Sequence, residues 1–296
     1  MLLKPLGHLS GMTEGQLHSS GQPLLLHCQD LDICVPARGQ SASHQVLISQ
    51  LSWQIHAGEC WAVLGCNGAG KSTLLRALNS LHPCDMRCVR WQSRPLSAYS
   101  ARQCAQHIGL MLQQSHTGLQ NTALELVLTG TYPHHTGWYR DNAADQQVAL
   151  CALADVGLSD KVHTPLAVLS GGELRRAELA RLLVQNPALA MLDEPLNHLD
   201  ISQQFAMLPL LQQRFQTSHQ ALVLVLHDLN LARHIASHCL LLFGDGRWQA
   251  GETATVATVS ALSALMDHPL SEFTTPMGKH LSYHLNPIPS SANLSA

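Results

Sequence analysis

The sequence predicts an α/β fold whose core is a mainly parallel β-sheet. Apolar runs at residues 60–64, 189–192 and 221–226 have the length and continuity of strands that are buried on both faces. Stretches with helical periodicity lie between these runs, and alternating strands and helices favour a parallel sheet covered by helices. A glycine-rich loop joins the first run to the helical pattern that follows it at residues 74–78.

Two further regions surround this core. The apolar runs at residues 24–26 and 46–48 predict strands of a small sheet that leads into the glycine-rich loop. Residues from about 96 to 165 are dominated by helical periodicity, and residues 145–158 in particular are spaced as one helix that ends near Gly157. We therefore expect a helical subdomain inserted between the first strand of the core and the remaining ones.

Composition excludes several classes of protein. The net charge of −3 and an aromatic content of 4% do not favour a nucleic-acid partner, and no such partner is expected. Nine cysteines without a C-x-x-C pair indicate neither a zinc ribbon nor a thioredoxin motif, and they suit a reducing compartment. The longest apolar runs fall far short of the ~20 residues that cross a bilayer, so we expect a soluble chain that reaches a membrane through its partners.

Residues 65–73 match the phosphate-binding pattern G-x-x-x-x-G-K-[ST] between a strand and a helix. The glycines let successive backbone N–H groups turn toward a phosphate, and the N-terminus of the helix adds a partial positive charge. Lys71 can reach the β- and γ-phosphates of a nucleotide, and the hydroxyl of Ser72 can bind Mg²⁺. The residues expected to contact the nucleotide are Gly65, Cys66, Asn67, Gly68, Ala69, Gly70, Lys71, Ser72 and Thr73.

A second glycine-rich helix start, the sequence LSGGE at residues 169–173, separates this chain from most other nucleotide-binding classes. It places Ser170, Gly171 and Gly172 at a helix N-terminus with Glu173 in the first turn, which is again a site for phosphate. The stretch resembles the signature motif of ATP-binding cassette (ABC) ATPases. The resemblance implies that all four residues bind ATP.

Two carboxylates follow the buried run at residues 189–192. Asp193 is expected to hold Mg²⁺, directly or through water, and Glu194 to act as the general base that polarises the attacking water. Three further positions resemble the same family in order. Gln113 resembles the Q-loop glutamine, which senses Mg²⁺ and the γ-phosphate. Residues 197–200 resemble the D-loop, and His227 resembles the switch histidine, which contacts the γ-phosphate and orients Glu194 and water.

The resemblance covers residues 24–251 and implies a RecA-like P-loop ATPase core with a small antiparallel β subdomain and a helical subdomain, the ABC ATPase fold. The expected division is a disordered extension over residues 1–22, an ABC ATPase domain over 23–254 and a C-terminal tail over 255–296. The cofactors implied are ATP and Mg²⁺. Two cassettes are expected to pack head to tail as a homodimer, with each ATP between the phosphate loop of one and the LSGGE of the other.

Two positions depart from the family pattern. The family usually has an aromatic residue upstream of the phosphate loop that stacks on adenine, whereas residues 27–50 of this chain contain no Phe, Tyr or Trp. Val35 or His44 would then pack on adenine in its place. Cys66 stands where proline is common.

Local sequence narrows the branch of the family. The stretch 124–134 resembles the V-x-x-G-R-x-P-H segment in the ATPases of iron-siderophore, haem and vitamin B12 importers, with Thr131 in place of arginine. Residues 267–270 resemble the GHP segment at the end of the sequences of that group. The implied partners are transmembrane permease subunits and, indirectly, a substrate-binding protein. The implied location is peripheral, at the cytoplasmic face of the inner membrane.

Three alternatives stay open: a soluble ABC ATPase that acts on nucleic acid or ribosomes, an ABC transporter ATPase with a different cargo, and a non-catalytic nucleotide-binding regulator. The presence of Lys71, Asp193, Glu194 and His227 disfavours the last.

Overall fold

The structure is a computed structural model of the 296-residue chain, and it describes residues 21–36, 44–82, 86–113, 121–135, 142–275 and 278–283. Of the expected N-terminal extension over residues 1–22, all but the last two residues lie outside the described part.

A six-stranded sheet forms the centre of the molecule, in the order β10-β9-β3-β8-β7-β6. All neighbouring pairs are parallel except β9 and β10. Leu, Val and Ala side chains fill both faces of β3, β7 and β8, so every residue in these strands is buried. The predicted α/β fold is confirmed. The strands are β3 (Cys60–Gly65), β6 (Ile108–Met111), β7 (Leu189–Asp193), β8 (Ala221–Val225), β9 (His238–Leu242) and β10 (Trp248–Glu252).

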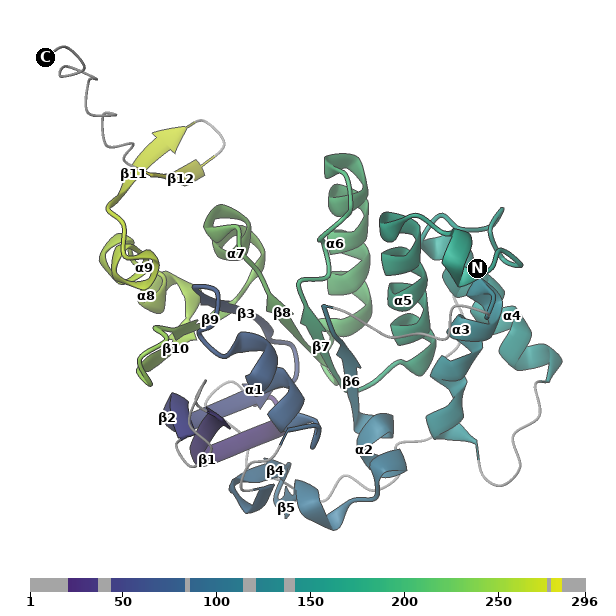
Figure 1. Cartoon of the computed structure of the whole chain (residues 1–296), viewed down its shortest axis with the longest axis horizontal. Helices are drawn as coiled ribbons and strands as arrows, with labels where there is room; N and C mark the ends of the chain where they lie inside the picture. Colours follow the sequence, from purple (N-terminus) through teal and green to yellow (C-terminus); the bar gives the residue numbers. More distant parts are fainter. Residues whose placement is uncertain are drawn as a thin grey trace, which may run out of the picture.

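A second, antiparallel sheet lies beside the first and contains both predicted N-terminal strands (Figure 1). Its order is β2-β1-β4-β5, and helix α1 (Lys71–Leu78) packs between the two sheets within one apolar cluster. This packing holds the start of α1, and with it the phosphate loop, against both sheets. The strands are β1 (Leu24–Pro36), β2 (His44–His56), β4 (Val89–Trp91) and β5 (Arg94–Pro95).

A group of helices lies at the β6 edge of the main sheet (Figure 1). It consists of α3 (Ala123–Leu128), α4 (Ala143–Asp155) and α5 (Gly171–Gln185), with α3 and α4 both packed on α5. The sequence assigned residues 96–165 to helices, but β6 falls inside that range and belongs to the main sheet. Helix α5 falls outside the range and joins the helical group, because its apolar residues face both β6 and the other helices.

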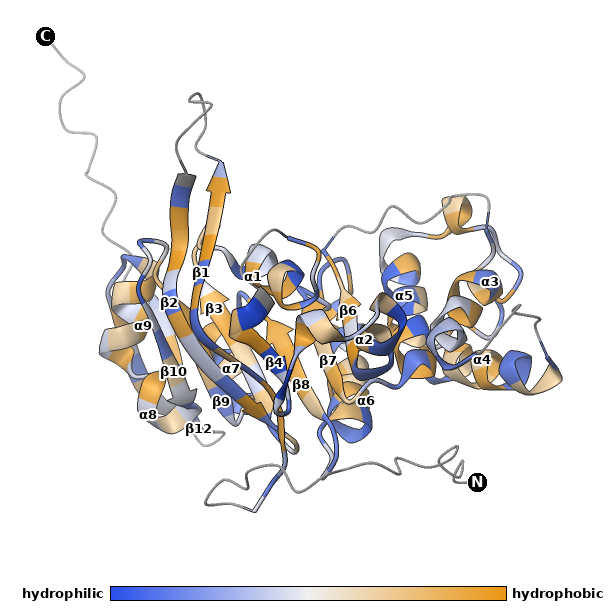
Figure 2. Ribbon diagram, turned by 90° about the horizontal axis from the view of Figure 1, so that it is seen from below, coloured by the Kyte–Doolittle hydropathy of each residue, from blue (hydrophilic) through white to orange (hydrophobic). Residues whose placement is uncertain are grey.

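Helices α6 (Ile201–Phe215) and α7 (Leu229–Ile235) cover the face of the main sheet opposite α1. Their apolar sides belong to a second apolar cluster, separate from the one that contains α1. Figure 2 shows the central strands β3, β7 and β8 of the main sheet largely in the colours of apolar residues. The remaining helices are α2 (Ala101–His107) and the short 3₁₀ helices η1 (Met86–Cys88), η2 (Leu96–Ala98), η3 (Thr129–His134) and η4 (Leu166–Val168).

The C-terminal segment carries helices α8 (Thr253–Val256) and α9 (Val259–Met266), followed by a hairpin of β11 (Leu270–Thr275) and β12 (Gly278–Tyr283). The sequence predicted only a tail over residues 255–296, and it gave no sign of the hairpin. Asn230 on α7 accepts a hydrogen bond from the Leu281 amide at 2.7 Å, and Arg233 pairs with Glu272 at 2.7 Å. These bonds attach the hairpin to the core. Within the described ranges, no helix combines the length and apolar character needed to cross a bilayer.

Candidate functional site

The phosphate loop leaves the end of β3 and enters α1 at Lys71. Gly70 caps the helix with φ at +97°, a conformation that residues with a Cβ rarely adopt, and a Cβ there would lie 3.2 Å from that of Leu47. The Leu74 amide already bonds to the Gly70 carbonyl at 2.8 Å. The strand, loop and helix predicted from the sequence therefore adopt the geometry of an anion-binding helix start.

A cavity of about 680 Å³ opens over this loop. Its size suits a small-molecule ligand. Loop residues Asn67, Gly68, Gly70, Lys71, Ser72 and Thr73 line it, together with Gln113, Glu194 and the side chains of Val35, Pro36, Gln45 and Leu47. Three of the nine predicted loop residues, Gly65, Cys66 and Ala69, do not line the cavity; the thiol of Cys66 instead donates to the Leu265 carbonyl at 3.2 Å.

Lys71 is buried beneath the loop, and its ammonium group donates to the carbonyls of Gly65 at 2.7 Å and Cys66 at 3.0 Å. Burial lowers the pKa of Lys71 from its ordinary value, while the carboxylates of Glu194 and Asp193 act in the opposite direction. Two neighbouring acids thus favour a charged ammonium, which is the form that binds phosphate.

Asp193 at the end of β7 is fully buried, and neither of its carboxylate oxygens has a hydrogen-bond partner within the described residues. Burial raises the pKa of its carboxyl group above the ordinary value, and the Glu194 charge adds to this rise. The neighbouring Ser72 hydroxyl, although it makes no hydrogen bond of good geometry, and the charges of Arg175 and Lys71 act in the opposite direction. A buried carboxylate without partners is costly, and a hard divalent cation would satisfy its oxygens. The side chains of Asp193 and Ser72 therefore fit Mg²⁺. No set of three His, Cys, Asp or Glu side chains in the described ranges is grouped for a metal, so water and phosphate would complete the ligands.

Three predicted residues meet at the carboxylate of Glu194. Gln113 donates to its Oε2 at 2.7 Å, and Nε2 of His227 lies 2.5 Å from its Oε1. These residues follow β6, β7 and β8, so the parallel sheet brings their ends to one edge. Glu194 also has φ at +50°, in the left-handed region, which costs about 1–3 kcal/mol for a residue other than glycine and persists only where the surroundings hold it.

The LSGGE residues lie at the start of α5, away from the cavity over the phosphate loop. Ser170 caps α5 by accepting from the Glu173 amide at 3.2 Å, and Glu173 accepts from the Ser170 amide at 2.8 Å. These bonds to Ser170 lower the pKa of Glu173. A Cβ on Gly172 would lie 2.8 Å from the His198 carbonyl oxygen, so glycine permits this close approach, whereas Gly171 has room for one. None of Ser170, Gly171, Gly172 and Glu173 lines the cavity.

Two residues at the site were not foreseen. Asn197 donates its side-chain amide to Oε2 of Glu194, and Arg175 on α5 donates to backbone carbonyls at the end of β7. Asn197 had been placed only in the D-loop segment as a whole. The available signal for Arg175 was its spacing of three residues from Glu178, which places the two side chains together on a helix.

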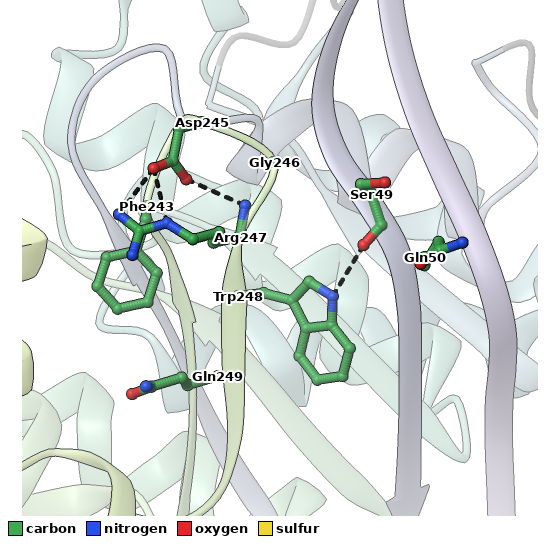
Figure 3. A pocket seen from close by; sticks show the side chains of 8 residues that line it. All are labelled: Ser49, Gln50, Phe243, Asp245, Gly246, Arg247, Trp248 and Gln249. Carbon is green, nitrogen blue, oxygen red and sulfur yellow. Dashed lines mark hydrogen bonds and ion pairs between the residues drawn. The ribbon is translucent and has the colours of Figure 1, made fainter.

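A second hollow of about 430 Å³ lies between β2 and the turn into β10 (Figure 3). Arg247 in its wall pairs with Asp245 at 2.7 Å and covers the Phe243 ring, and the Trp248 indole donates to the Ser49 carbonyl at 3.0 Å. These polar and charged groups are satisfied by one another, and none of the predicted site residues lines this hollow.

Comparison with known proteins agrees with this geometry. Residues 48–197 match the family model described as "ABC transporter". The chain is 36% identical over 248 residues to the hemin import ATP-binding protein HmuV of Methylobacillus flagellatus, covering 81% of this chain and 91% of the relative. It is 36% identical over 192 residues to the ferric enterobactin transport ATP-binding protein FepC of Escherichia coli K12, covering 65% of this chain and 71% of that relative.

A solved structure described as a metal-chelate type ABC transporter in an inward-facing conformation superposes with a TM-score of 0.71 at 26% identity, covering 88% of this chain and 97% of that one. The resemblance to the ATPases of iron-siderophore and haem importers is therefore confirmed at the level of relatives. The chain belongs to the ABC transporter family, as one of its ATP-binding proteins.

Proposed function

We propose that this chain is the ATP-hydrolysing subunit of an ABC importer that takes up a metal chelate such as an iron-siderophore, haem or cobalamin. The observation that carries the hydrolytic part is the convergence of Gln113 and His227 on the Glu194 carboxylate at the rim of the Lys71 cavity. The names of the relatives, a hemin importer and a ferric enterobactin transporter, support the class of cargo.

The chemistry follows from the groups at the site. Lys71 and the loop amides would bind the β- and γ-phosphates of ATP, and Ser72 and Asp193 would hold Mg²⁺, which would supply positive charge to offset that of the phosphates. Glu194 takes a proton from water as the water oxygen bonds to the γ-phosphorus and the bond from that phosphorus to the ADP oxygen breaks. His227 and Gln113 hold the carboxylate toward the cavity, which is the alignment that a general base needs.

The signature loop supports a homodimer. Ser170, Gly171 and Gly172 begin a 15-residue helix but do not line the cavity of their own chain, so a second chain would supply them to the ATP. Ile201 and Phe205, one turn apart on α6 directly after the D-loop segment, are 72% and 71% exposed. Apolar side chains at that position suit contact with a second cassette.

The remaining partners are a pair of transmembrane permease subunits and, through them, a substrate-binding protein. The chain would act at the cytoplasmic face of the inner membrane as a peripheral subunit. The helical group around α3 and α4 is the part of the fold that would reach the permease.

Reconstitution tests the proposal. The wild-type chain and its co-purified permease would be placed in proteoliposomes with internal ATP and offered haem, a ferric siderophore or cobalamin with a matching binding protein. We expect ATP-dependent uptake of one of these, and none with Glu194→Gln, which still assembles with the permease. ATP hydrolysis by a chain that recruits no permease from membranes would contradict the transport role.

A further inference from the structure

Arg175 is a buried cation in the second turn of α5, with 4% of its side chain exposed. Its Nη2 donates to the carbonyls of Asp193 and of Glu194, the latter at 3.0 Å. Its Nη1 donates to the Leu112 carbonyl at 2.6 Å and to Oε2 of Glu178 at 3.0 Å. One guanidinium group thus bonds the backbone of two separate segments of the site.

These two segments carry both partners of the Gln113–Glu194 hydrogen bond. Leu112 directly precedes Gln113, and Glu194 is itself a target of Arg175. The left-handed backbone of Glu194 needs surroundings that hold it, and the bond from Arg175 to its carbonyl is such a constraint. Arg175 therefore fixes how the two side chains meet, without reaching the cavity itself.

The energetics favour a positioning role over a purely stabilising one. A buried ion pair such as Arg175 with Glu178 is often no more stable than apolar residues of the same volume, because both charges lose their hydration. The Nε of Arg175 has no hydrogen-bond partner among the described residues, which adds to the cost. What apolar replacements cannot supply is the set of directed bonds to three backbone carbonyls.

Helix α5 connects this cluster to the signature loop. The helix begins at Gly171, capped by Ser170, and Arg175 follows only about one turn later, so the two move as one rigid piece. In Figure 1, α5 lies at the β6 edge of the main sheet, and β7 is the next strand. The ends of these two strands carry the two segments that Arg175 bonds.

We propose that Arg175 is a positioning residue that couples the signature end of α5 to Glu194 and Gln113 of the same chain. The proposal rests on the proposed function, because it assumes that ATP hydrolysis uses Glu194. Contact of the signature loop with a nucleotide on the partner cassette would then reach, through α5 and Arg175, the hydrolytic residues of the chain's own cavity.

Steady-state ATPase kinetics of Arg175→Met and Arg175→Lys test this. Because Arg175 does not touch the cavity, we expect Arg175→Met to lower kcat by about tenfold to a hundredfold while KM for ATP stays within about threefold. Arg175→Lys keeps the charge and some of the bonds and should recover part of kcat. The matched control is Arg181→Met, since Arg181 on the same helix donates to the Leu110 carbonyl at 3.2 Å but to neither segment of the site.

Loss of folding is separated from loss of positioning by the double variant Arg175→Met with Glu178→Leu, which replaces the buried pair by apolar side chains of similar size. Unfolding by heat would confirm that it is folded. We expect kcat to stay low in this folded variant. Restoration of kcat in the double variant, or a wild-type kcat in Arg175→Met, would overturn the proposal. A wild-type chain without ATPase activity would instead refute the proposed function.

Discussion

Nε2 of His227 lies 2.5 Å from Oε1 of Glu194, and the two residues follow neighbouring parallel strands of the main sheet. The other carboxylate oxygen accepts from Gln113 at 2.7 Å. Both oxygens of the expected general base are therefore held by residues whose only link in the sequence is their place after a strand. A change at either neighbour should alter the orientation of the carboxylate.

Gln113→Ala should separate communication from binding. Gln113 bonds Glu194 and lies at the junction with the helical group, whereas phosphate binding is assigned to Lys71 and the loop. We expect ATP affinity within a few-fold of wild type but little stimulation of ATPase activity by permease and loaded binding protein in liposomes. Gln212→Ala is a matched control, because Gln212 bonds the Ile235 carbonyl at 3.2 Å away from the cavity. Equal stimulation of Gln113→Ala and wild type would refute the coupling role.

Discrimination between nucleotide bases should be weak. Among the described residues, the cavity wall beyond the phosphate loop consists of Val35, Pro36, Gln45, Leu47, Gln113 and Glu194, and none of these side chains is an aromatic ring that could stack on adenine. We expect GTP to compete with ATP within about one order of magnitude in affinity, roughly 1.4 kcal/mol. The measurement is a competition titration with a fluorescent nucleotide, and strong preference for ATP would reveal an adenine contact outside this wall.

Val35→Tyr should then strengthen ATP binding, because a ring placed in the wall can stack on the base. Val46→Tyr is its control: Val46 is an exposed residue of β2, next to Leu47 but not part of the cavity wall. Similar gains in both variants would argue against a base site at Val35.

His107 should make the fold sensitive to acid. Burial lowers its pKa below the ordinary 6.5, in a site where its ring stacks on Trp91 at 5.0 Å. The unfolded chain binds the proton more readily, so this contribution is fully present above pH 6.5 and is lost as the pH falls toward the folded pKa. We expect His107→Phe to lose less free energy of unfolding than wild type between pH 7.5 and about 5, measured by urea titration. Parallel losses would contradict this.

The parts of the fold that could be predicted are those whose sequence pattern is compatible with only one type of secondary structure. Continuous apolar runs become β7 and β8 because strands buried on both faces need no polar alternation. Strand β6 was hidden, since its four residues include Gly109 and lie among helical patterns. Helix α5 was not assigned to the helical group because it is buried against two partners and lacks a single apolar stripe.

The candidate site, too, could be predicted only in part. The phosphate loop and the acidic strand end could be located from residue types alone, because few other sequences suit phosphate and a divalent cation. The meeting of Gln113 and His227 at Glu194 depends on strand order, which no local pattern contains. Arg175 was missed because a buried arginine and an exposed one look alike in a helical sequence.

The most direct test of the account is the hydrolysis rate of Glu194→Gln at saturating ATP, with ATP binding measured alongside. Loss of a general base costs about 10²–10⁴-fold, so we expect a rate reduced by that factor, near-normal ATP affinity and a stable ATP-bound dimer. Glu125→Gln is the matched control, because its capping box with Thr122 can be completed by glutamine. A wild-type rate in Glu194→Gln would contradict the assignment of Glu194 as the base.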